Sequence, residues 1–177
     1  MASDRRNSPM FWLVIVGVVL ADIVTKAMAV YALVPRGIPR EVIGEYLRFT
    51  LVYNPGAAFG LHLGDYSRWI FTVLTLGALY ILSRLYVTTR AEDWPRVLAI
   101  ALVCAGAIGN LIDRLRSPLG VVDFIDIGLS ADLRWWTFNI ADMAVSTGAF
   151  MLAWVLWGEE KAEAAATTRL SSEPTEI

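Results

Sequence analysis

Four aspartates in the second half of the chain stand in or beside apolar stretches, where an ionised carboxylate is costly unless it is paired. Two carboxylates in a partly dry site cannot both ionise easily, so one keeps its proton. Such a pair can catalyse hydrolysis, because the base activates a water and the acid polarises a carbonyl. The candidates are Asp113, Asp123, Asp126 and Asp142. Their positions alone do not say which two meet, nor that the pair cleaves peptides.

The local sequence distinguishes these aspartates. Asp123 lies in "VVDFI", among neighbours that raise the pKa of a carboxyl group, and we expect either Asp123 or Asp126 to be solvated. We interpret Asp113 as a member of an interfacial ion pair with Arg116. If the last apolar stretch becomes helical near residue 135, Asp142 lies about 10 Å along it, on the same side of the membrane as Asp123.

Other polar residues share helical faces with these carboxylates or with each other. Asp22 and Lys26 are four residues apart, with the acid first, which is the favourable order for an ion pair on one helix face. We expect this pair to be buried and to hold helices together. Asn110 and Arg114 share a face of a helix whose small residues, "AGAIG", allow close helix approach. Asn139 lies three residues before Asp142, on the same face.

The composition narrows the class of protein and of chemistry. The chain has 177 residues, is 56% hydrophobic and carries a net charge of −2. This composition indicates a multi-pass membrane protein, and nothing in it suggests a nucleic-acid partner. A single cysteine, Cys104, allows no internal disulfide, and a single histidine, His62, argues against histidine-rich metal sites and a Ser-His-Asp triad. Any hydrolytic chemistry must therefore rely on carboxylates, lysine or serine.

The elements that must position these residues are predicted from apolar length. Four stretches can cross a bilayer, at about residues 10–34, 69–87, 96–116 and 135–157. The first resembles a signal peptide, but charges near its end and three further spans favour a retained helix. An even number of spans places the connections 35–68 and 117–134 on one side, although the distribution of Lys and Arg leaves the orientation open.

The remaining segments have their own patterns. Apolar and polar residues alternate in "EYLRFTLVYN", which predicts a strand. The "NPGAAFG" that follows is either a hairpin turn or a substrate contact. We expect residues 1–158 to form a single membrane-embedded domain and residues 159–177 to be a tail that is disordered after a short helical extension.

Five motifs in order carry a family resemblance. They are "DIVTK" from Asp22, "NPGAAFG" from Asn54, "GAIGNLIDR" from Gly106, "VVDF" from Val121 and "FNIAD" from Phe138. With four spans in a chain of this length, the sequence resembles the lipoprotein signal peptidases, or signal peptidase II, of bacteria. Two positions depart from the family pattern, Ala105 before Gly106 and Met143 after Asp142.

The resemblance implies a fold and a place in the cell. The fold is an α-helical integral membrane protein with four transmembrane helices. A small β-platform lies between helices 1 and 2 on the outer face, and a surface helix or lid lies between helices 3 and 4. The protein would span the bacterial cytoplasmic (inner) membrane with both termini in the cytoplasm, and one copy would contain every catalytic part.

The resemblance also implies an aspartic endopeptidase that needs no metal ion or organic cofactor. Its substrates would be prolipoproteins that carry diacylglycerol on a cysteine, cleaved immediately before that cysteine, and membrane lipids and the inhibitor globomycin would be further partners. The catalytic dyad would be Asp123 and Asp142. The supporting residues would be Asn54, Gly56, Asn110, Arg114, Asn139, Asp22 and Lys26.

Three other readings are less well supported by the residues. A small transporter also places carboxylates in membrane helices, but favours mid-bilayer charges and repeated halves. A non-enzymatic scaffold would use the charges as packing pairs. A Ser-Lys protease could use Lys26, but Ser67, Ser83 and Ser146 are poorly placed as nucleophiles.

Overall fold

Helices dominate the structure, a computed structural model that describes residues 8–56, 64–90, 92–130 and 132–172. The helices are α1 (Ser8–Ala32), α2 (Ser67–Thr88), α3 (Trp94–Arg116) and α4 (Ile140–Ser172), and a short 3-10 helix, η1 (Gly64–Tyr66), precedes α2. Each of the four α-helices contains a stretch long and apolar enough to cross a membrane. The four predicted spans are therefore confirmed as helices.

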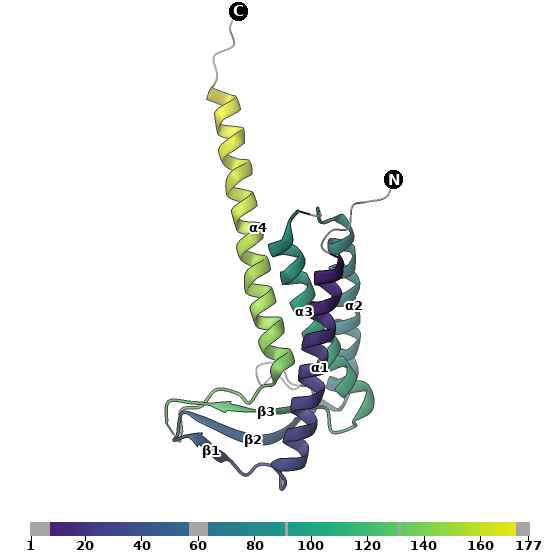
Figure 1. The fold of residues 1–177 in the computed structure, drawn as a ribbon, viewed down its shortest axis with the longest axis vertical. Helices are drawn as coiled ribbons and strands as arrows, with labels where there is room; N and C mark the ends of the chain where they lie inside the picture. The colour runs from purple at the N-terminus through teal and green to yellow at the C-terminus, as the bar shows by residue number, and fades with distance from the viewer. Residues whose placement is uncertain (1–7, 57–63, 91, 131, 173–177) are drawn as a thin grey trace, which may run out of the picture.

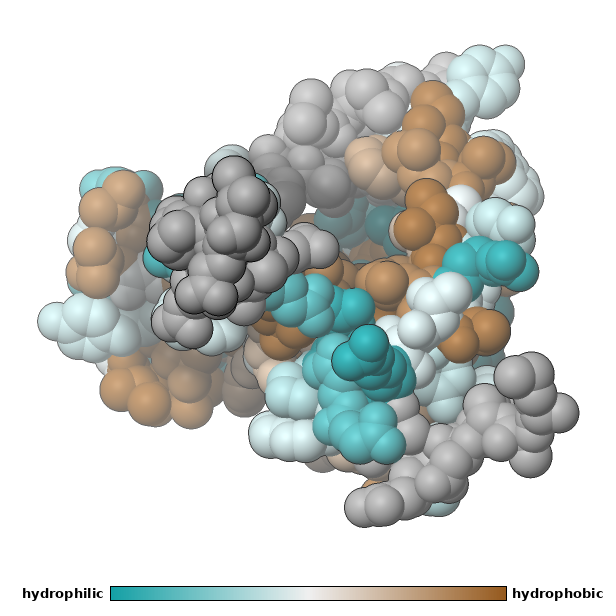
Figure 2. Space-filling model, turned by 90° about the horizontal axis from the view of Figure 1, so that it is seen from above, coloured by the Kyte–Doolittle hydropathy of each residue, from teal (hydrophilic) through white to brown (hydrophobic). Residues whose placement is uncertain are grey.

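The helix α3 lies at the centre of the bundle and packs against α1, α2 and α4. Its start is fixed by Asp93, whose side chain accepts a hydrogen bond from the backbone N–H of Arg96 (3.2 Å). Half of the most apolar 18-residue stretch of α3 is buried, whereas only 6% of the corresponding stretch of α2 is buried. Many apolar side chains are exposed, and hydrophobic residues form several separate patches in the view of Figure 2. Such a surface suits a lipid environment.

A three-stranded antiparallel sheet lies at the end of the bundle where α4 begins (Figure 1). Its strands, in sheet order, are β1 (Arg40–Ile43), β2 (Leu47–Asn54) and β3 (Val121–Ile127). The strand predicted from alternation is β2, and its neighbour β3 comes from the connection between α3 and α4. A small apolar core of Ala29, Leu33, Leu51, Val122 and Phe124 joins the sheet to the end of α1. The predicted platform is confirmed, with a third strand from the second connection.

The connection between α3 and α4 contradicts two expectations. A surface helix or lid was expected there. Its described residues between 117 and 139 form β3 and a segment that returns beside it and contain no helix, so the surface helix is wrong, while the lid stays a prediction. The helix α4 begins at Ile140 and not near residue 135, because residues before it pair with β3: the Phe138 N–H donates to the Ile125 carbonyl (3.0 Å). Asp142 is therefore in the first turn of α4.

The other end of α4 also differs from the expectation. The helix continues to Ser172, whereas disorder was predicted soon after residue 159. The sequence "EEKAEAAATTRL" is rich in strong helix formers, and these residues can extend an existing helix without a new nucleation step.

Candidate active site

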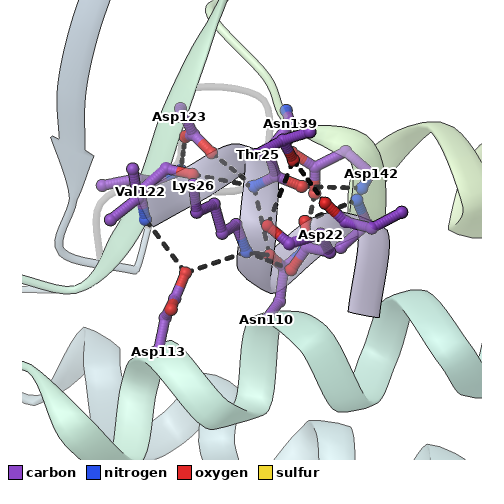
Figure 3. A network of polar contacts seen from close by, with 12 residues as sticks. Asp22, Thr25, Lys26, Asn110, Asp113, Val122, Asp123, Asn139 and Asp142 are labelled. Carbon is purple, nitrogen blue, oxygen red and sulfur yellow. Dashed lines mark hydrogen bonds and ion pairs between the residues drawn. The ribbon is translucent and has the colours of Figure 1, made fainter. Parts of the chain in front are cut away.

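Asp123 and Asp142 approach one another from a strand and a helix. Asp123 lies on β3 and is 2% exposed, and Asp142 is in the first turn of α4. Asn139 joins them: its Nδ2 donates to Asp123 Oδ1 (2.7 Å), and its backbone N–H donates to Asp142 Oδ2 (3.2 Å). The close-up in Figure 3 shows the two carboxylates on either side of this asparagine.

The "NIAD" motif forms a reciprocal cap at the start of α4. The Asp142 N–H donates to Asn139 Oδ1 (2.9 Å), while the Asp142 carboxylate accepts from the Asn139 N–H. A capping residue and an acid three positions later satisfy each other's backbone donors in this way. The N-terminus of a helix also stabilises negative charge. The motif thus both starts the helix and orients one of the two aspartates.

Two further asparagines hold the outer oxygens of the pair. Asn110 Nδ2 donates to Asp142 Oδ1 (2.7 Å), and Asn54 Nδ2 donates to Asp123 Oδ2 (3.2 Å). Asn54 is held in turn by the Gly56 N–H, which donates to Asn54 Oδ1 (3.1 Å). Gly56 has a φ of 122°, and a Cβ there would lie 2.9 Å from the backbone of Arg68, so the position requires glycine. Residues 57–60 of the same motif lie outside the described residues.

A cluster of charged side chains contacts Asn110, one of the residues that bind the pair. Lys26, which is 4% exposed, lies 2.7 Å from Asp22 Oδ2 and 2.8 Å from Asp113 Oδ2, and its Nζ donates to Asn110 Oδ1 (3.0 Å). Asp22 Oδ1 accepts from the Ala141 N–H of α4 (3.0 Å). The predicted Asp22–Lys26 pair is confirmed, and it joins α1 to both α3 and α4.

Asp113 is an ion-pair member, as predicted, but its partner is different. It pairs with Lys26 of α1 and accepts a hydrogen bond from the Val122 N–H (3.2 Å), so the expected pairing with Arg116 is wrong. The physical reason is that Arg116 is exposed and solvated by water, whereas the buried Lys26 ammonium needs carboxylate partners and the partly buried Asp113 supplies one.

Asp126 is outside the pair. It is buried like Asp123, so the expectation that one of the two is solvated is wrong. Its carboxylate accepts from Arg134 Nε (2.6 Å) and from Thr50 Oγ1 (3.1 Å). Since successive strand residues point to opposite faces, an offset of three residues turns Asp126 away from Asp123.

Arg114 lies beside the pair. Its charge interacts electrostatically with Asp142 and Asp123, yet its buried Nε has no hydrogen-bond partner among the described residues. Sequence reasoning missed Arg68, which donates from Nε to the Arg114 carbonyl (2.5 Å) and so caps the end of α3. Its partner is a backbone carbonyl in another helix, which leaves no mark in the sequence.

Burial sets the protonation of Asp123. Desolvation by burial, and after it the negative charge of Asp142, together raise the pKa of Asp123 to about 7, against the opposing hydrogen bonds from Asn54 and Asn139. At neutral pH a proton is therefore available on the strand side of the pair. Over the described part of the chain, no group of three or more His, Cys, Asp or Glu side chains is placed to hold a metal ion.

The fold and site define a multi-pass membrane protein in which a buried aspartate, Asp123, and a partly buried one, Asp142, are linked through Asn139 at one end of the helical bundle. Residues 14–158 match the sequence model of a family described as signal peptidase (SPase) II. The chain is 40% identical over 146 residues to a lipoprotein signal peptidase of Rhodococcus jostii, covering 78% of this chain and 68% of that one. It is 41% identical over 145 residues to one of Polynucleobacter necessarius, covering 80% and 83%.

The structure is also similar to a solved one. A bacterial membrane enzyme determined by the in meso method at 2.3 Å resolution matches with a TM-score of 0.77 and 29% identity, over 96% of this chain and 95% of that chain. The chain belongs to the signal peptidase II family, a family of membrane peptidases. The resemblance drawn from the five motifs is thereby confirmed.

Proposed function

We propose that the protein is an aspartic endopeptidase that removes the signal peptide from diacylglyceryl-modified prolipoproteins, cleaving immediately before the lipidated cysteine. The observation that carries this proposal is the pairing of Asp123 and Asp142 through Asn139, with Asp123 buried. The names of the relatives support the substrate class, because they are lipoprotein signal peptidases.

The pair divides the work of hydrolysis. Asp142, which accepts hydrogen bonds at both oxygens, acts as the base and takes a proton from a water whose oxygen attacks the scissile carbonyl carbon. Asp123, protonated, donates its proton to the carbonyl oxygen. When the tetrahedral intermediate collapses, the C–N bond breaks and the proton held by Asp142 passes to the leaving amine of the lipidated cysteine. The proton on the former carbonyl oxygen returns to Asp123.

The neighbouring residues have supporting roles. Asn54, Asn110 and Asn139 fix the carboxylate oxygens, and Gly56 permits the turn that holds Asn54. Asp22 and Lys26 anchor the start of α4, and Arg114 offers a charged donor to the substrate backbone.

The arrangement of the helices supports an orientation. The start of α1 and the end of α4 lie away from the sheet (Figure 1), whereas Asp123 lies on β3 and Asp142 in the first turn of α4. We place both termini in the bacterial cytoplasm, the sheet and active site at the outer face of the inner membrane, and the helical residues 159–172 beyond the single membrane-embedded domain of residues 1–158. One copy carries the complete pair, so a monomer surrounded by lipid is sufficient, and globomycin would block this site.

The test is cleavage of a diacylglyceryl-modified prolipoprotein by purified protein in lipid nanodiscs. Asp123→Asn and Asp142→Asn should each lower kcat by about 10²- to 10⁴-fold, the usual contribution of an acid or base. Asp132→Asn is the matched control, because Asp132 is an exposed carboxylate of the same connection. Each variant is checked for folding by its melting temperature.

The outcomes separate the readings. Cleavage retained by either dyad variant would overturn the catalytic assignment. A folded wild type that binds the prolipoprotein but never cleaves it would overturn the peptidase proposal in favour of a transport or scaffold role.

A further inference from the structure

The return segment, residues 134–138, delivers Asn139 to the dyad. It runs antiparallel beside β3, and the backbones of Phe138 and Ile125 exchange hydrogen bonds (3.0 and 2.8 Å). Asn139 follows directly and meets Asp123, two residues from Ile125 along β3. The alignment of the return segment with β3 therefore decides where α4 begins relative to Asp123.

The backbone ladder by itself does not fix this alignment. The bridges are Ile125 with Phe138 and Gly128 with Arg134, so two residues of β3 face three residues of the return segment. Such a bulge leaves one residue unpaired. A slip of one residue would move the chain by about 3.3 Å and turn its side chains to the other face. A side-chain interaction that fits only one alignment would select the register.

Arg134 makes such an interaction. Its Nε donates to Asp126 Oδ1 (2.6 Å), its Nη2 to the Asp126 carbonyl (3.0 Å), and its Nη1 to the Glu45 carbonyl in the β1–β2 turn (2.7 Å). The second oxygen of Asp126 accepts from Thr50 on β2 (3.1 Å). The planar guanidinium holds its donors at fixed angles, so it can satisfy these partners together in one register.

Gly128 shows how closely the two strands approach at this point. A Cβ at Gly128 would lie 2.8 Å from Arg134 Nη1 and 2.8 Å from the Leu133 carbonyl. Any side chain there would displace the guanidinium or the backbone beside it. The space at Gly128 is therefore part of the arginine's site.

We propose that Asp126 and Arg134 are positioning residues that fix the register of the return segment and so set Asn139 and Asp142 against Asp123. The role rests on the proposed peptidase function. Asp126 lies on the opposite face of β3 from Asp123, so the pair acts through the backbone and not by contact with the reacting groups.

The first measurement is turnover in nanodiscs by Arg134→Gln, Arg134→Lys and Asp126→Asn. We expect kcat to fall about tenfold to a hundredfold for Arg134→Gln, as for small misplacements of catalytic groups, with KM changed less than about threefold. Arg134→Lys keeps the charge but not the fork and should recover part of the loss. The control is Arg40→Gln, an arginine of the same sheet that donates to the Val34 carbonyl (3.1 Å).

A double-mutant cycle separates positioning from general destabilisation. If Asp126 and Arg134 act through Asn139, the double variant Arg134→Gln/Asn139→Ala should have a kcat only slightly lower than that of Asn139→Ala alone. Effects that multiply would overturn the proposal. If Arg134→Gln does not fold, Arg134→Lys and Thr50→Val carry the same cycle.

Hydrogen exchange tests the register without any substrate. The amides of Trp135 and Phe138 donate to β3, so both should lose protection in Arg134→Gln while the amides within α3 keep theirs. Unchanged exchange at these amides would overturn the proposed role of Arg134 in fixing the register. If the wild type is inactive but Arg134→Gln still increases exchange at these amides, the peptidase proposal is overturned, while the proposed role of Asp126 and Arg134 in fixing the register stands.

Discussion

The two ends of the helical bundle are built from the same helices but bury different kinds of side chain. We call the end next to the β-sheet the sheet end and the opposite end the far end. At the far end, α1, α2 and α3 bury an apolar cluster that includes Phe11, Ile100 and Ala101, with Phe11 stacked on Tyr86 at 3.9 Å. At the sheet end, α1 and α3 bury charges and amides, among them Lys26 and Asn110.

The difference separates stability from chemistry along one helix. Apolar burial at the far end is favourable and tolerates exchange between residues of similar size. Each polar group at the sheet end is held by several partners, because a buried polar group without a partner costs free energy. Substitutions at the sheet end should therefore affect turnover, or stability and turnover together, while substitutions at the far end should affect stability alone.

The largest effect should come from Lys26→Met. Removal of the ammonium leaves the buried Asp22 and the partly buried Asp113 without their cation, which costs about 3–5 kcal/mol in the free energy of unfolding. Denaturant unfolding in detergent measures the loss. The control is Lys161→Met, whose ammonium stands 4.0 Å over the Trp157 ring at the protein surface and should cost about 0.5–1 kcal/mol. Equal losses for the two lysines would contradict the comparison between the ends.

A matched pair of glycines tests the same contrast between α3 and α4. A Cβ at Gly109 would lie 2.6 Å from Asp22 Oδ2, and one at Gly148 would lie 2.7 Å from the Ala99 carbonyl. Both alanine variants should lose about 1–3 kcal/mol of stability through overpacking. Only Gly109→Ala should also lower kcat per folded molecule, because it displaces Asp22 and with it the Ala141 N–H at the start of α4. A lowered kcat in Gly148→Ala would show that the ends are coupled.

The pH dependence should follow Asp123. Because burial raises the pKa of Asp123 to about 7, kcat/KM should fall as the pH rises through about 7, where the acid loses its proton. Between the ordinary value of 3.8 and about 7 the folded state holds a proton that the unfolded state has released, so stability should fall across this window as the pH rises. Asp123→Asn should flatten this trend in melting temperature. A melting temperature that rises over this window in the wild type and not in the variant would contradict the assignment.

Local patterns predicted the elements whose cause is local. Apolar length indicated the helices, period-2 alternation indicated β2, and an acid–lysine pair four residues apart indicated the buried pair in α1. The motif resemblance pointed to Asp123 and Asp142, which the structure brings together through Asn139.

Two of the errors involve partners distant in sequence. Trp135 and Trp136 are typical of a membrane interface and suggested a helix start, but the Trp135 N–H donates to the Ile127 carbonyl on β3 (2.8 Å). Asp113 stands near Arg116 in the chain, yet pairs with Lys26 of α1. A strand pairing or an ion pair between distant segments depends on the fold, and no local spacing encodes it.

The smallest effect should come from Arg96→Gln at the far end, which complements Arg134→Gln at the sheet end. Arg96 lies 3.1 Å from Asp93 and also pairs with the partly exposed Glu159 of α4. Partly exposed ion pairs contribute about 0–1 kcal/mol and weaken in salt, so the melting temperature should change little and less at high ionic strength. Turnover should not change, because Arg96 orients no residue of the dyad. Arg96 and Arg134 each join an aspartate to a neighbouring segment. The same Arg→Gln substitution at both positions thus distinguishes an ion pair that only connects helix ends from one with the proposed role of fixing the register of residues 134–138 beside β3.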